Sequence, residues 1–148
     1  MNTKPLSINY TAVIVTGFIA FVLSGLWYSP MVFGSIWMHY RNAGVSLFPK
    51  WTMMFAPLRE LIASYVLALL ITRLHLFQWK SAVKLILLLW LAFHAVGMAG
   101  AILWDNMAWQ LGAVHAGDWL MKMVFMAVVL SIWHNKNVQR IAKGDGVH

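Results

Sequence analysis

Residues 8–27 read INYTAVIVTGFIAFVLSGLW, a run of 20 residues without a charged side chain. About 20 apolar residues are needed for a helix to cross a hydrocarbon core of ~30 Å. The run predicts a transmembrane helix, because a lone strand in lipid would leave its backbone polar groups unpaired. It ends on Leu26, Trp27 and Tyr28 rather than on small residues, so we interpret it as a retained span and not as a cleaved signal peptide.

Three further apolar runs are present, at about residues 56–76, 82–103 and 108–133, before a polar tail at 134–148. Each is close to the length of a membrane span. We therefore expect a single transmembrane domain over residues 1–148. The expected fold is all-α, an integral membrane four-helix bundle with a short interfacial helix in its first outer loop.

The composition excludes several other classes of protein. Hydrophobic residues make up 61% of the chain and charged residues 10%, which leaves too little polar surface for a soluble globule. The mean hydropathy is +0.72. The absence of cysteine excludes disulfide scaffolds, zinc fingers and iron–sulfur centres. A net charge of +7 does not indicate nucleic-acid binding here, because the basic residues are scattered between apolar runs.

The basic residues predict an orientation instead. With four spans both termini lie on one side, together with the loop between the second and third spans. That side holds seven of the 11 basic residues, namely Lys4, Arg73, Lys80, Lys84, Lys136, Arg140 and Lys143. The positive-inside rule places this side in the cytoplasm. We expect a multi-pass protein of the cell membrane, specifically a bacterial inner membrane, with the lipid bilayer as its main partner.

The first loop, Ser29–Phe55, carries apolar residues near helical spacing. We expect Met31–Tyr40 to form a helix on the outer membrane surface, with Pro30 in its first turn and Pro49 beyond its end. Tryptophan and tyrosine also gather near the predicted outer boundaries. Their position favours an aromatic belt, with a ligand-stacking cage as the alternative. The residues are Trp27, Tyr28, Trp37, Tyr40, Trp51, Trp104 and Trp109.

Small residues recur at every fourth position of the first span, at Ala12, Thr16, Ala20 and Ser24. Such a ladder lets another helix approach closely. It indicates packing within one chain or, as an alternative, a homo-oligomer formed through these four residues. The second span has a similar stripe, which consists of Glu60, Ser64, Ala68 and Thr72. The third span places Gly97 and Ala101 near His94.

Residues 25–37, GLWYSPMVFGSIW, resemble the signature of the DUF1761 family of small multi-pass membrane proteins of unknown function. Residues 90–93 and 115–120 also resemble that family, so the resemblance covers nearly the whole chain. It implies a four-helix membrane fold and no particular reaction. By their chemistry, the motif residues fit either a structural corner or the mouth of a binding site. The motif residues are Trp27, Tyr28, Ser29, Pro30, Phe33, Gly34 and Trp37.

Ionisable residues within spans are costly and therefore candidates for a ligand-binding polar interior. On the second span Arg59 and Glu60 are adjacent, so their partners should lie on other elements. On the fourth span Asp118 and Lys122 are spaced for a local pair. The full candidate set is Arg59, Glu60, His94, His115, Asp118 and Lys122.

His94 and Asp118 each lie 12 residues from the turn expected at Asn106, which places them at matching depth. We expect both to point into the bundle, close enough for a direct or water-bridged contact, with His115 and Lys122 lining the same interior. This arrangement would be either a polar lock between helices or a working site.

No cofactor or metal is expected. Two weaker alternatives are a divalent metal held by His115 and Asp118, and a haem held by His94 and His115. The chain lacks the motifs of hydrolases, metalloproteases and nucleotide-binding enzymes, so enzymatic activity is not favoured. The leading hypothesis is a membrane protein that binds or transports a small solute, ion or lipid through a polar pocket. The alternatives are an accessory or assembly subunit and an intramembrane enzyme that uses His and Asp.

Overall fold

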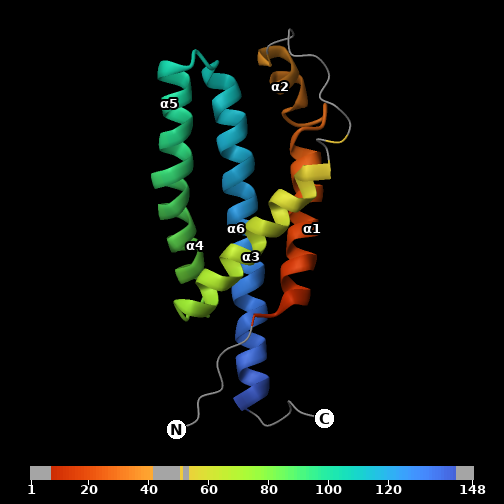
Figure 1. Ribbon diagram of the computed structural model, residues 1–148, viewed down its shortest axis with the longest axis vertical. Coiled ribbons are helices and arrows are strands. Elements are labelled where there is room, and N and C mark those ends of the chain that lie inside the picture. The colour runs from red at the N-terminus through yellow and green to blue at the C-terminus, as the bar shows by residue number, and fades with distance from the viewer. Residues whose placement is uncertain (1–7, 42–50, 52–53, 143–148) are drawn as a thin grey trace.

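The computed structural model describes residues 8–41, 51 and 54–142, with side chains up to residue 134. Over these residues the fold is helical and contains no strand, which confirms the all-α prediction (Figure 1). The elements, in chain order, are α1 (Tyr10–Trp27), α2 (Gly34–Tyr40), α3 (Phe55–Arg73), α4 (Trp79–Leu89), the π-helix η2 (Trp90–Ala95), α5 (Val96–Trp104) and α6 (Trp109–Ala142).

Four helices are long and apolar enough to cross a membrane. They are α1, α3, the continuous helix Trp79–Trp104 formed by α4, η2 and α5, and residues Trp109–His134 of α6. All four begin within a few residues of the runs that the hydropathy predicts, and the first three also end there. Helix α6 continues to Ala142, nine residues past the expected end at 133 and into the expected tail. Asn106, at the expected turn before α6, has a φ of 54°, a left-handed conformation that asparagine tolerates well.

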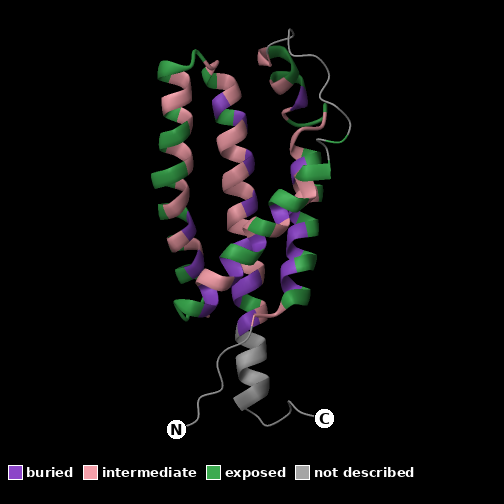
Figure 2. Ribbon diagram, in the orientation of Figure 1, coloured by how far each residue is buried: buried purple, intermediate pink, exposed green. Residues whose placement is uncertain are grey.

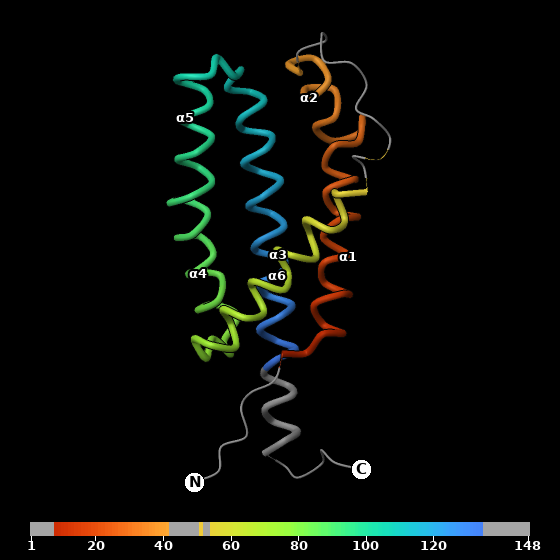
Figure 3. Tube along the Cα trace, viewed as in Figure 1, coloured from red at the N-terminus to blue at the C-terminus, as the bar shows by residue number. Residues whose placement is uncertain are grey.

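Helix α6 is the centre of the arrangement, because α1, α2, α3 and the third span all pack against it. Helix α3 crosses in front of α6 at a marked angle, from the α2 end of the molecule to the start of α4 (Figures 1 and 3). Near the start of α4, one small cavity is lined by Asn9, Ala68 and His134. The start of α1 therefore lies beside the later part of α6.

The small-residue stripes of the first two spans face inward, as Figure 2 shows by the buried faces of α1 and α3. The hydroxyl of Ser64 donates to the carbonyl of Val13 at 2.9 Å, which joins α3 to α1. A second copy of the chain would reach the α1 stripe only if these helices separated. The buried stripe residues are Ala12, Thr16, Ala20 and Ser24 on α1, and Glu60, Ser64, Ala68 and Thr72 on α3.

The third span differs from the expected pattern. Gly97 is exposed, and a Cβ placed there would meet no atom within 4 Å, so it does not bring α6 close. The span packs through Ala82 and Ile86 instead, both of which are buried. The physical reason is the π-helix, which contains His94 and ends just before Gly97. An extra residue per turn rotates the later part of the helix, so the spacing of an ordinary α-helix no longer predicts a shared face.

The segment between α1 and α2 forms a tight corner. The backbone N–H groups of Val32 and Gly34 both donate to the carbonyl of Ser29, at 3.1 and 2.9 Å. Helix α2 begins at Gly34 rather than at Met31, so the expectation that Pro30 lies in its first turn is wrong. Its placement on the membrane surface stays a prediction.

Trp27 and Tyr28 turn toward α6. The indole N–H of Trp27 donates to the carbonyl of Val114 at 3.1 Å. Its ring covers Gly117, where a Cβ would lie only 2.7 Å from the indole carbon Cζ2. The ring centres of Phe33 and Trp27 lie 4.4 Å apart. The motif is therefore a structural corner that fixes the end of α1 against α6.

Several residues named above lie outside the described part of the chain. They are Lys4, Pro49 and Lys143, together with the side chains of Lys136 and Arg140.

Candidate functional site

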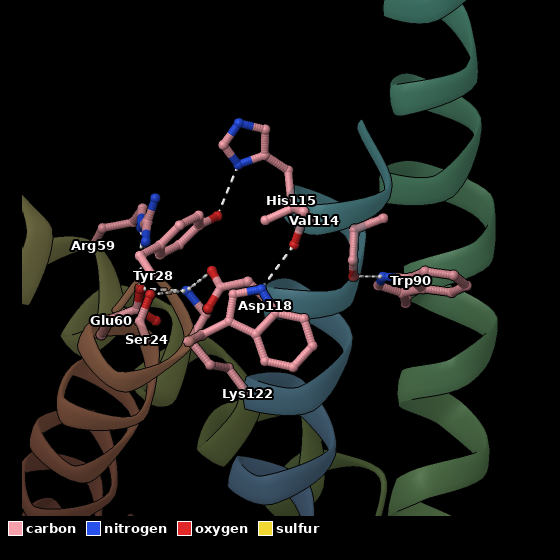
Figure 4. Close-up of polar contacts among 11 residues, drawn as sticks. Ser24, Tyr28, Arg59, Glu60, Trp90, Val114, His115, Asp118 and Lys122 are labelled. Carbon is pink, nitrogen blue, oxygen red and sulfur yellow. Dashed lines mark hydrogen bonds and ion pairs between the residues drawn. The ribbon is translucent and has the colours of Figure 1, made fainter. Parts of the chain in front are cut away.

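Lys122 is the centre of a buried cluster of charges. It projects from α6 with 0% of its surface exposed. Its ammonium lies 2.8 Å from Oε1 of Glu60 on α3 and 2.7 Å from Oδ2 of Asp118, one turn earlier on α6. The hydroxyl of Ser24 on α1 lies at 3.5 Å (Figure 4). One cation therefore joins three helices, and the predicted pair of Asp118 with Lys122 is confirmed.

Arg59 completes the charge balance of the cluster. Its Nε and Nη2 donate to Oε1 of Glu60 at 3.1 and 2.7 Å. Both residues do have partners on another element, as expected, since Glu60 meets Lys122 and Arg59 lies over Trp119, both on α6. They also pair with each other, which was not expected, because the arginine side chain is long enough to fold back onto its neighbour. With Lys122 and Asp118, two cations balance two anions, as burial of charge requires.

Two carboxylate oxygens of this cluster have no hydrogen-bond partner within the described residues. They are Oε2 of Glu60 and Oδ1 of Asp118, and both residues are only 1% exposed. Buried acceptors of this kind are uncommon in folded proteins. Each carboxylate therefore pairs with Lys122 through one oxygen, while its other oxygen has no hydrogen-bond partner among the described residues.

Tyr28 and His115 lie above the cluster, toward α2. The Tyr28 hydroxyl and Nδ1 of His115 share a hydrogen bond of 2.8 Å (Figure 4). A tyrosine phenol keeps its proton at neutral pH, and burial raises the pKa of Tyr28 further. His115 is thus held by α1 and does not bond to Asp118, although both lie on α6.

Of the direct or water-bridged contact predicted between His94 and Asp118, the described residues show no direct hydrogen bond. Asp118 binds Lys122, while Nε2 of His94 is buried without a hydrogen-bond partner within the described residues. The ring centre of His94 lies 5.4 Å from the ring centre of Trp119 on α6. The π-helix again explains the difference, since it sets the direction of His94. His94 and His115 consequently face different neighbours, Trp119 and Tyr28.

A groove lies beside the charge cluster and has a volume of about 840 Å³. Helix α3 forms one wall and the end of α4 with η2 forms the other, while Trp119 and Met123 of α6 form the floor. The lining is mostly apolar, and its one residue with a permanent charge is Arg59. The groove residues are Phe55, Ala56, Leu58, Arg59, Ile62, Ala63, Val66, Leu67, Leu70, Leu89, Trp90, Phe93, His94, Trp119 and Met123.

Trp119 connects the groove to the charge cluster. The guanidinium carbon of Arg59 lies 5.4 Å from the centre of its ring, and the ammonium of Lys122 lies at 4.9 Å. Both distances fit cation–π contacts. On the opposite wall the indole N–H of Trp90 donates to the carbonyl of Ala116 at 3.0 Å, which ties η2 to α6 (Figure 4).

Of the six residues proposed from the sequence, four meet in one cluster: Arg59, Glu60, Asp118 and Lys122. His94 lines the groove and His115 binds Tyr28. Reasoning from the sequence did not select Trp90 and Trp119, which shape the groove. Trp119 carried one usable signal, because it lies directly beside Asp118 and three residues before Lys122.

Most of the chain resembles one known family of proteins. A family model described as "Protein of unknown function (DUF1761)" matches residues 11–131. Comparison with curated proteins gave no match, and comparison with solved structures gave none.

Proposed function

The chain belongs to the DUF1761 family, whose function is unknown, and we propose that it binds a hydrophobic small molecule taken from the surrounding bilayer. The observation that carries this proposal is the groove between α3 and η2. Its volume of about 840 Å³ is in the usual range of small-molecule sites, and its lining is mostly apolar. The walls belong to helices that are long and apolar enough to lie in a membrane, so a ligand would enter from lipid.

The π-helix supports the same proposal. Single π-helical turns inside longer helices occur frequently at functional sites. Here the π-helix supplies three of the groove residues, Trp90, Phe93 and His94. The charge cluster behind Trp119 would hold α3 and α6 at the spacing that the groove needs.

Filling the groove tests this proposal. Replacing Ala63 with phenylalanine puts a large ring into the groove from the α3 wall. We expect wild-type protein in mild detergent to retain a bound apolar molecule, detected by native mass spectrometry. We expect Ala63→Phe to lose it. The matched control is Ala99→Phe, at an exposed position of α5 outside the groove, which should retain the ligand. Equal retention by Ala63→Phe and wild type would contradict the proposal.

We also propose a location in the cell membrane with both termini in the cytoplasm, on the strength of the basic residues around the second loop. The chain has no cysteine, so single cysteines can report the orientation. Gln78 and Asp105 are exposed near opposite ends of the third span. In intact cells an impermeant thiol reagent should label Asp105→Cys, whereas Gln78→Cys should react only after lysis. The reverse pattern would contradict this orientation.

A further inference from the structure

We infer that the ligand of the groove is an anionic amphiphile, a hydrocarbon chain that carries a terminal phosphate or carboxylate. This inference rests on the proposed function and names the class of molecule that the groove would take. Three observations support it: the permanent charge in the groove lining is positive, the Arg59 side chain is directed to the groove floor, and the neighbouring carboxylates are buried out of reach of a ligand.

Arg59 is the one permanently charged residue in the groove lining, and it is cationic. Its side chain is 49% exposed, whereas the side chains of Glu60 and Lys122 are each 1% exposed. A molecule in the groove would therefore meet the guanidinium but not the other charges of the cluster. Because Lys122 already pairs with both carboxylates, Arg59 is not the sole counter-ion of either one.

The geometry of Arg59 leaves donors for a ligand. Nε and Nη2 bind Glu60, and no hydrogen bond within the described residues uses Nη1. A guanidinium presents its donors in a planar fork that matches phosphate and carboxylate oxygens. Glu60 and the Trp119 ring hold the plane of this fork in place, so little side-chain entropy would be lost when an anion binds.

The position of Arg59 also differs from that of a lipid-anchoring arginine. Arginines near helix ends usually extend toward the headgroup layer. Arg59 lies in the second turn of α3 but turns inward, toward Glu60 and across Trp119 of α6. The guanidinium is thus directed to the floor of the groove. The groove runs on along α3 past Ile62, Val66 and Leu70, which would contact the hydrocarbon chain of the ligand.

The test compares two probes with the same chain, hexadecyl phosphate and hexadecanol, titrated against the detergent-solubilised full chain at pH 7 by native mass spectrometry. Wild-type protein should bind the phosphate roughly tenfold more tightly than the alcohol, the factor expected for a charge-assisted hydrogen bond. Arg59→Gln should remove this preference, so that the two probes bind with equal affinity. The matched control is Arg73→Gln, at an exposed arginine at the other end of α3 and outside the groove, which should keep the preference.

The outcomes separate this inference from the proposed function. Equal binding of the two probes, with both blocked by Ala63→Phe, would overturn the anionic ligand and leave the groove as a binding site. Binding of neither probe to the groove would overturn the proposed function itself. If Arg59→Gln does not fold, Arg59→Lys keeps the charge but loses the planar fork, so its preference should be weaker than that of wild type. A wild-type preference that Arg59→Lys weakens and that Ala63→Phe abolishes would support the inference, and a preference unchanged in either variant would contradict it.

Discussion

Replacing Lys122 with methionine is expected to lower the free energy of unfolding by about 3–5 kcal/mol, the cost of leaving buried charges without their partner. The ammonium lies 2.8 Å from Glu60 and 2.7 Å from Asp118, and both carboxylates are almost completely buried. Methionine fills a similar volume, so the loss would come from charge rather than from a cavity. Stepwise titration with a denaturing detergent, monitored by circular dichroism, measures this change.

A rescue variant separates charge from packing. In the quadruple variant Arg59→Gln, Glu60→Met, Asp118→Leu and Lys122→Met, all four charges of the cluster are removed together, and the three buried ones are replaced by apolar side chains of similar size. Because a buried ion pair replaced by apolar residues of similar volume is often neutral in stability, the quadruple variant should recover most of the loss. The control is Lys84→Met, at an exposed lysine of α4, which should change stability little. Equal effects of Lys122→Met and Lys84→Met would contradict the role assigned to the cluster.

Replacing Gly34 with alanine is expected to cost about 1–3 kcal/mol, the usual penalty for inserting a methyl group where there is no room. A Cβ at this position would lie 2.6 Å from the carbonyl carbon and oxygen of Ser29, and closer still to the carbonyl oxygen of Tyr28. These are backbone atoms, which cannot move without opening the corner. The corner holds Trp27 against Gly117, so α1 and α6 should loosen together.

Gly25 provides the matched control, because it precedes the corner in the same stretch of sequence. It lies in α1, and a Cβ there would meet nothing within 4 Å. Gly25→Ala should be neutral or stabilise by about 0.5–1 kcal/mol, since alanine is the better helix former. The same detergent titration reports both variants. If Gly34→Ala were as stable as Gly25→Ala, the close approach at the corner would be refuted.

The sequence predicted those features that depend on local spacing. The apolar runs define the four spans, because the length of a span is set by the bilayer. The stripes that contain Thr16 and Ser64 face inward because residues four apart share one side of an α-helix. The same spacing predicted the pair of Asp118 with Lys122. Each of these inferences needs only the geometry of a single regular helix.

The remaining features depend on how helices lie relative to one another. Glu60 meets Lys122 across 62 positions of sequence, and no pattern within either helix indicates that pairing. The groove exists because α3 crosses α6 at an angle and diverges from η2, an arrangement that hydropathy does not encode. His94 was misplaced because the spacing argument assumed a regular α-helix through Trp90–Ala95, where the structure has a π-helix.

The central claim, that the groove takes a molecule from the bilayer, is tested most directly by photo-cross-linking in lipid vesicles with an alkyl chain that carries a diazirine. Peptide mapping of the labelled protein would locate the cross-links. We expect labelling concentrated on the groove residues that are not exposed on the outer faces, Ala63, Leu67, Trp119 and Met123, and its loss in Ala63→Phe. Labelling confined to the exposed outer faces at Ile14, Phe18 and Leu103, and unchanged in Ala63→Phe, would contradict it.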